Sequence, residues 1–132
     1  MGFQILIIED DQLLAKYLKD IVSKHHRTFV CHDLESAKNA ISNIKPDLVF
    51  TDLNLSNDVP LEGLSIVEIC KSQNIPSVVL TSHGEDEVIR EAFIRGCSHY
   101  LVKDEFENEV EVENEVEAEN EVKAENEIEA EI

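Results

Sequence analysis

Polar side chains stand directly after four of the short apolar runs in the first 103 residues of the chain. They comprise an acidic group, a single aspartate, two hydroxyls and a lysine, at Glu9–Asp11, Asp52, Thr81–Ser82 and Lys103. Crowded carboxylates repel one another and favour a bound cation, and oxygen ligands without His or Cys favour Mg²⁺ over zinc. An aspartate can attack a phosphoryl group while a hydroxyl and an ammonium hold its oxygens. These residue types therefore indicate phosphoryl transfer assisted by Mg²⁺, with Mn²⁺ able to substitute.

Each of these residues also has a plain structural interpretation. Glu9 and Asp10 can be solvated loop acids beside a helix start, and Asp52 can cap a loop. Thr81 can be a strand-end hydroxyl, and Lys103 can be a surface lysine. Their joint placement at strand ends favours the chemical interpretation over a set of coincidences.

The elements that must position these residues alternate along the chain. Five short runs rich in β-branched and aromatic residues predict buried parallel strands, at Phe3–Ile8, Thr28–Cys31, Asp47–Thr51, Ser77–Thr81 and His99–Val102. Strands alternating with helices predict an α/β fold, a doubly wound five-stranded parallel sheet with helices on both faces. Ligands collect at the carboxyl ends of the strands in such sheets, which is where the polar residues stand.

Four helices are predicted between the strands from apolar residues at helical spacing. Their apolar faces are formed by Leu13, Leu14, Tyr17, Leu18, Ile21 and Val22; by Leu34, Ala37, Ile41 and Ile44; by Leu64, Val67, Ile69 and Cys70; and by Val88, Ile89, Ala92 and Phe93. Asp11 and Asp33 are placed to cap the first two helices. Pro46 ends the second helix and Gly96 ends the fourth.

The formal charge of −18 is spread unevenly along the chain. Residues 1–103 carry 15 acids and 10 Lys or Arg, whereas residues 104–132 carry 14 acids and one Lys. Because neither part has a basic stripe that could neutralise phosphates, direct binding to nucleic acid or to an anionic membrane is disfavoured. The chain also lacks a signal-peptide pattern and a long apolar segment, so we expect a cytoplasmic protein.

The cysteines and most of the histidines have no pattern typical of a metal or redox site. The odd number of cysteines and the lack of CxxC spacing indicate small buried hydrophobes at Cys31, Cys70 and Cys97. Surface or packing roles are expected for His25, His26, His32 and His99.

The stretches ILIIEDD, DLVFTDLNL, SVVLTS and YLVK, with Gly63 ahead of an apolar helix, resemble the receiver domains of two-component response regulators. The resemblance covers residues 1 to about 103 and is closest to single-domain, chemotaxis-regulator-like receivers. It implies a flavodoxin-like sheet with strand order 2-1-3-4-5. It also implies a phosphorylation-activated signalling switch, in which Asp52 accepts a phosphoryl group from a sensor histidine kinase or a histidine phosphotransfer protein.

The resemblance assigns metal ligands to four positions of this sequence. Asp10 and Asp52 would ligate Mg²⁺ directly, Asn54 would contribute its backbone carbonyl, and Glu9 would act through water. In this family the module promotes its own phosphorylation and dephosphorylation and is not otherwise an enzyme.

The resemblance also assigns the catalytic and switch residues. Thr81 and Lys103 would contact the phosphoryl oxygens. The Thr81 hydroxyl would then move toward the phosphate and Tyr100 would turn inward, which exposes a face made by the fourth helix, fifth strand and fifth helix to a downstream protein. Asn54 and His83 would neighbour the attacking water and tune dephosphorylation. A core-filling role for Tyr100 and a bystander role for His83 stay open.

Two departures from the family pattern keep other functions open. Asp104 follows Lys103 where most receivers have proline, and the loop over residues 52–63 is longer than usual by about three residues. One alternative is an unphosphorylated pseudo-receiver that only binds partners. A Mg²⁺-dependent aspartyl phosphatase is the other, although Asn54 occupies the place where it would need a second acid.

A hexapeptide repeat begins at Glu107, with the units ENEVEV, ENEVEA, ENEVKA and ENEIEA followed by EI. We therefore expect a receiver core over residues 1–106 and an acidic tail over residues 107–132. Three interpretations of the tail stay open: a helix extending from a fifth helix over about residues 104–116, a mobile acidic segment, or a strand that pairs with another chain. We expect a monomer or a weak homodimer.

Overall fold

A computed structural model describes residues 2–56, 58–103 and 128–132 of the chain. Five parallel strands form one sheet in the order β2-β1-β3-β4-β5. The strands are β1 (Gln4–Ile8), β2 (Arg27–Cys31), β3 (Leu48–Thr51), β4 (Ser77–Thr81) and β5 (His99–Val102). The predicted fold and strand order are therefore confirmed.

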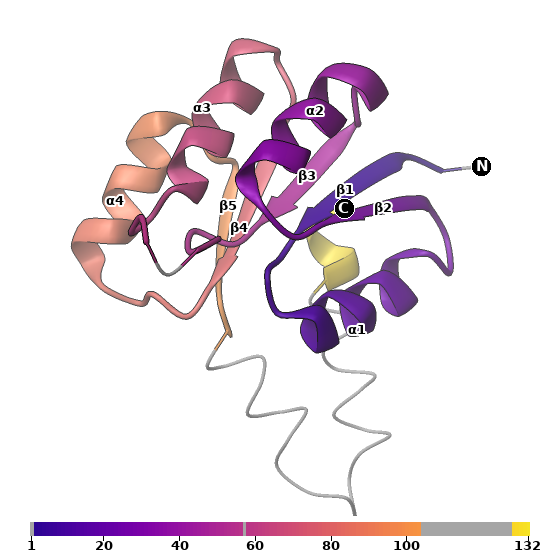
Figure 1. The fold of residues 1–132 in the computed structure, drawn as a ribbon, viewed down its shortest axis with the longest axis horizontal. Coiled ribbons are helices and arrows are strands. Elements are labelled where there is room, and N and C mark those ends of the chain that lie inside the picture. Colours follow the sequence, from indigo (N-terminus) through magenta and orange to yellow (C-terminus); the bar gives the residue numbers. More distant parts are fainter. Residues whose placement is uncertain (1, 57, 104–127) are drawn as a thin grey trace, which may run out of the picture.

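Helices cover both faces of this sheet (Figure 1). They are α1 (Gln12–Val22), α2 (Leu34–Ile44), α3 (Gly63–Ser72) and α4 (Asp86–Arg95). Because side chains alternate across a strand, Ile5 and Ile7 pack with α1, while Leu6 and Ile8 pack with α2 and α3. The inner strands β1, β3 and β4 are therefore buried, as predicted, whereas the edge strands β2 and β5 are only partly buried because each has a neighbour on one side alone.

The helix caps form at the residues that the sequence predicts. Asp11 accepts hydrogen bonds from the N–H groups of Leu13 and Leu14, and Asp33 accepts one from Ser36 N–H. Helix α4 ends at Gly96, whose φ of 114° lies in the left-handed region that favours glycine. These caps satisfy backbone groups that the helix ends leave unpaired.

Two residues predicted to lie on apolar helix faces are instead exposed. Leu13 is 80% exposed and Phe93 is 47% exposed. Leu13 lies in the first turn of α1, and the buried side of that helix passes through Leu14, Ala15 and Leu18 instead. Phe93 lies over Tyr100 at the surface, with ring centroids 6.5 Å apart.

The predicted fifth helix, the boundary at residue 106 and most of the acidic repeat lie outside the described residues. The end of the repeat is described, and residues 128–131 form a helical turn. Ile128 is 1% exposed and belongs to the core cluster on the α1 side of the sheet. Within the described ranges, every helix is too short or too polar to cross a bilayer.

The cysteines provide a first test of this packing. Burial raises the pKa of all three thiols, to about 12 for Cys70 and to about 11 for Cys97. Cys31, expected to be buried like the other two, is only half-buried. Because the thiolate is the reactive form, iodoacetamide at about pH 8 should label Cys31 first and the other two at least roughly 100-fold more slowly. Peptide mapping by mass spectrometry checks this order, and equal labelling of all three in urea is the control. Rapid native labelling of Cys70 would contradict the packing.

Candidate functional site

Four of the predicted site residues lie at the carboxyl ends of neighbouring strands. Glu9 follows β1 and Asp52 follows β3, and the last residues of these strands, Ile8 and Thr51, are partners in the sheet. Thr81 ends β4 opposite the last residue of β5, which Lys103 follows. The parallel register therefore brings the four side chains to one edge of the sheet.

These four side chains are buried although all are polar. The exposed fractions are 1% for Glu9, 6% for Asp52, 0% for Thr81 and 7% for Lys103. Buried charges are costly unless they are paired, so their burial calls for specific partners.

Lys103 supplies that pairing by contacting two carboxylates at once. Its Nζ lies 2.7 Å from Glu9 Oε1 and 2.8 Å from Asp52 Oδ2. The sequence placed these three residues on one edge, and the structure brings them into direct contact. One ammonium thus faces two acids, which leaves the site short of positive charge.

The remaining carboxylate oxygens are held by backbone N–H groups. Asp52 Oδ1 accepts hydrogen bonds from Leu53 N at 2.7 Å and from Asn54 N at 3.3 Å. Glu9 Oε2 accepts one from Asp11 N at 3.1 Å. Both carboxyl groups are therefore fixed in orientation before any ligand binds.

Burial also shifts the ionisation of this group. Burial raises the pKa of Glu9 to about 8, a rise that the Lys103 ammonium opposes and the Asp52 carboxylate reinforces. Burial by itself would lower the pKa of Lys103, but the Asp52 and Glu9 carboxylates outweigh it and raise that pKa. Lys103 therefore stays charged, and Glu9 is the carboxyl group of this site whose ionisation burial and the Asp52 charge disfavour.

The acidic side of this site fits a divalent cation. Glu9, Asp10 and Asp52 each place a carboxylate oxygen within 4.8 Å of the others. Asp10 is exposed, so the group opens to solvent on one side. A donor set made only of oxygens suits Mg²⁺ or Mn²⁺ and offers nothing that would favour zinc. That the backbone carbonyl of Asn54 is a further ligand stays a prediction.

The predicted switch residues meet at the loop between β4 and α4. The Tyr100 hydroxyl donates a hydrogen bond to the His83 carbonyl at 2.7 Å, and His83 N lies 3.5 Å from Thr81 Oγ1. Burial raises the pKa of Tyr100 to about 12, so its hydroxyl keeps the proton that it donates. A short chain of contacts thus joins Thr81 to Tyr100 through this loop.

A second set of contacts joins His83 to the long loop after β3. Asn54 Oδ1 accepts a hydrogen bond from Leu61 N at 3.1 Å, which leaves its amide group to donate to His83 Nε2 at 2.6 Å. His83 Nδ1 lies 3.2 Å from Glu85 Oε2. These partners place the ring hydrogen on Nδ1 and occupy Nε2.

The sequence did not reveal two of the residues that position this site. Leu61 has a left-handed φ of 56° and fixes Asn54 through its N–H group. His32, expected to be a surface or packing residue, lies with Nδ1 2.9 Å from the Glu9 carbonyl oxygen. The extra length of the loop marked the segment that contains Leu61 without marking the residue itself, and no sequence signal marked His32.

Comparisons with known proteins agree with this geometry. A model of the response regulator receiver domain family matches residues 5–115. The chain is 26% identical over 104 residues to the transcriptional regulatory protein YdfI of Bacillus subtilis, covering 76% of this chain and 48% of that protein. It is 29% identical over 105 residues to the transcriptional regulatory protein KdpE of Staphylococcus aureus, covering 78% and 44%. The chain thus spans about half the length of these relatives.

A solved structure shows the same fold. The BeF3-activated receiver domain of DrrB superposes with a TM-score of 0.69 at 22% identity, covering 78% of this chain and 86% of that one. Since the family model matches most of the chain, and since the strand order and the acidic site agree with it, the chain belongs to the response regulator receiver domain family of two-component systems.

Proposed function

We propose that this chain is a switch that accepts a phosphoryl group on Asp52 from the phosphohistidine of a sensor histidine kinase or a histidine phosphotransfer protein. The observation that carries the proposal is the buried contact of Lys103 with both Asp52 and Glu9. Receiver domains are regulatory phospho-acceptor domains, so the reaction ends on the protein itself. We propose that the chain also promotes loss of this group, and that it acts on no separate substrate.

Several groups of the chain would each take a separate role in the transfer. An oxygen of the Asp52 carboxylate forms the new bond to phosphorus, and the bond from phosphorus to the donor imidazole breaks. Lys103 Nζ and the Thr81 hydroxyl donate hydrogen bonds to the phosphoryl oxygens, where negative charge builds up. Backbone N–H groups already hold Asp52 Oδ1, which preserves the orientation of the carboxyl group.

Mg²⁺ is the cofactor that we propose for this site, and Mn²⁺ can substitute. Asp10, Asp52, the Asn54 carbonyl and, through water, Glu9 would hold it. When bound, the ion neutralises charge on the carboxylates and on the phosphoryl group. The oxygen-only donor set and the excess of acids over Lys103 support this assignment.

The phosphorylated site would signal through the contacts of Thr81, His83 and Tyr100. A phosphoryl group on Asp52 adds a charge of about −2 and strong acceptor oxygens, which attract the Thr81 hydroxyl. Because His83 links Thr81 to Tyr100, a shift of this loop changes the surface of α4 and β5. We propose a downstream protein as the partner for that surface, with no direct role for nucleic acid or a membrane, in a cytoplasmic monomer or weak homodimer.

Asn54 and His83 are the residues that we propose to set the lifetime of the phosphorylated state. Asn54 N donates a hydrogen bond to Asp52 Oδ1, and His83 contacts the Asn54 side chain, so both belong to the loops past which water would approach an acyl phosphate. The Asn54 amide occupies His83 Nε2, the nitrogen that could otherwise accept a proton from that water. This contact favours slow hydrolysis.

A small phosphodonor tests the proposed function directly. Incubation with acetyl phosphate and Mg²⁺ should add one phosphoryl group, which intact-mass spectrometry detects and peptide mapping after reduction with borohydride assigns to Asp52. Asp52→Asn should show no addition, and chelation of Mg²⁺ should stop the reaction in the unaltered protein. A protein that gains no phosphoryl group and binds no beryllofluoride would indicate a pseudo-receiver. Sustained consumption of acetyl phosphate would indicate a phosphatase.

A further inference from the structure

The last residues of the acidic repeat lie on the α1 side of the sheet. Residues 128–131 form a helical turn beside α1, drawn in yellow in Figure 1. Ile128 packs into the core cluster with residues of α1 and of the strands, and Ile132 packs against the same cluster. The spacing of four places both isoleucines on one side of a helical turn, so the chain end is anchored by apolar contacts.

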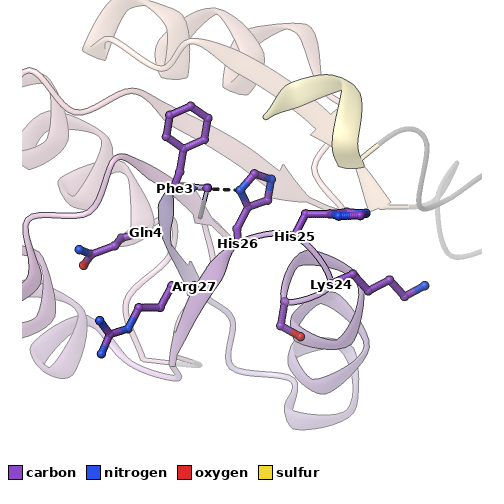
Figure 2. Close-up of a pocket in the computed structure, with 8 residues that line it drawn as sticks. Phe3, Gln4, Lys24, His25, His26 and Arg27 are labelled. Carbon is purple, nitrogen blue, oxygen red and sulfur yellow. Dashed lines mark hydrogen bonds between the residues drawn. The ribbon is translucent and has the colours of Figure 1, made fainter.

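Two histidines flank this turn and face its glutamates. Glu129 Oε2 lies 3.8 Å from His26 Nε2, and Glu131 Oε2 lies 3.1 Å from His99 Nδ1. Phe3 N donates a hydrogen bond to His26 Nδ1 at 3.1 Å (Figure 2), which places the ring hydrogen on Nε2. The imidazole of His26 is therefore oriented so that its N–H group faces the glutamate.

His26 also lies at a concentration of basic residues in an otherwise acidic chain. The sequence KHHR occupies residues 24–27. Together with residues 2–4 and 23, this run lines a pocket of about 670 Å³. Figure 2 shows how Lys24, His25, His26 and Arg27 lie in it. In a chain with a formal charge of −18, this run is a local concentration of basic residues, and His26 within it faces Glu129.

We propose that the face of the sheet beside α1, with His26 and His99 at its rim, is a binding site for an acidic helical turn of the form Ile-Glu-x-Glu-Ile. The chain's own residues 128–132 occupy this site as an intramolecular ligand. Apolar burial of Ile128 supplies the anchor, and the two glutamate–histidine contacts select an acidic segment. The site lies at the amino ends of β2 and β5, away from the carboxyl ends that hold Asp52.

The sequence of the repeat explains why its end is the occupant. Earlier units carry valine where the last carries Ile128, and Ile132 follows four residues later. The two isoleucines are the only ones after residue 103 in the sequence. Ile128 has one methylene group more than those valines, and Ile132 stands where an asparagine follows each of them, so the last unit offers the most apolar surface to the core cluster.

Hydrogen exchange on full-length variants tests the site. Ile128→Asp should raise the exchange rates of buried amides in α1 and β5 by about tenfold or more, since it places a charge in the core cluster. Glu129→Gln with Glu131→Gln keeps the apolar anchor and should raise those rates about two- to fivefold at low salt, with the difference vanishing at high salt. Ala130→Ser, at an exposed position of the same turn, is the matched control.

Binding of a peptide in trans tests the specificity. A fluorescent peptide with the sequence of residues 125–132 should bind full-length Ile128→Asp by anisotropy and restore its slow exchange. It should bind the unaltered chain at least tenfold more weakly, because the tethered turn competes at high effective concentration. Equal peptide binding to Ile128→Asp and to the unaltered chain would overturn the proposal. So would exchange rates in the Glu129→Gln, Glu131→Gln variant that equal those of Ala130→Ser at low salt. Neither measurement depends on phosphorylation of Asp52.

Discussion

Lys103→Met should slow phosphoryl uptake from acetyl phosphate by roughly 10²–10³-fold, the cost found when one hydrogen-bond donor to developing negative charge is removed from an active site. Lys103 Nζ already lies 2.8 Å from Asp52 Oδ2, so it is in place to meet the phosphoryl oxygens as they arrive. Methionine keeps much of the apolar stem and removes the ammonium. The initial rate of mass addition at saturating Mg²⁺ measures the effect.

The same substitution should also destabilise the protein when Mg²⁺ is absent. It leaves the buried carboxylates of Glu9 and Asp52 without their shared cation, and loss of one partner of a buried ion pair costs about 3 kcal/mol. Added Mg²⁺ should recover part of this loss, because the acids gain another counter-ion. Urea unfolding with and without Mg²⁺ measures the free energy of unfolding.

Two comparisons separate these effects from an ordinary loss of charge. Lys38→Met, at an exposed position on α2, should change neither the uptake rate nor the stability appreciably. Combining Lys103→Met with Glu9→Gln should restore stability but not the rate, since it removes repulsion without supplying a donor. A Lys103→Met protein that takes up phosphoryl groups at the original rate would contradict the assigned role.

The fold could be predicted because its local signals agree with one another. The unbroken apolar strands require cover on both faces, and Asp11, Asp33 and Gly96 mark helix ends by the mechanism observed in the structure. Leu13 and Phe93, which lie on predicted apolar faces, are exposed instead. A hydrophobic side chain at the margin of a helix face is buried or exposed according to its neighbours, which periodicity does not specify.

The site could be predicted as a set of residues but not as a set of contacts. Strand ends placed Glu9, Asp52 and Lys103 on one edge, because parallel register is a property of the sheet. The direction of each side chain depends on loops, and the hydrogen bond from Leu61 to Asn54 requires a left-handed residue that the sequence does not mark with glycine. The burial of Ile128 depends on tertiary contacts across most of the chain's length, which a local pattern does not encode.

Gly63→Ala should destabilise the protein by about 3 kcal/mol and disturb Asp52 at the same time. A Cβ atom at Gly63 would overlap the Asp52 carbonyl oxygen and lie 2.7 Å from Leu53 Cα. Both neighbours are backbone atoms, which cannot turn aside as a flexible side chain would. Gly63 N also donates a hydrogen bond to Leu53 O at 2.8 Å, so the start of α3 is held against the segment that carries Asp52.

Displacement of this segment should reach the chemistry through two backbone donors. Asp52 Oδ1 is held by the N–H groups of Leu53 and Asn54, so a shift at Leu53 turns the carboxyl group away from Lys103. We therefore expect Gly63→Ala to lower the midpoint of urea unfolding. We also expect the molecules that stay folded to take up phosphoryl groups more slowly. Gly84→Ala is the matched control, because a Cβ atom there meets only Val102 Cγ1 at an ordinary 3.8 Å. If both alanine variants retained full stability and uptake, close approach of α3 to β3 would not be what positions Asp52.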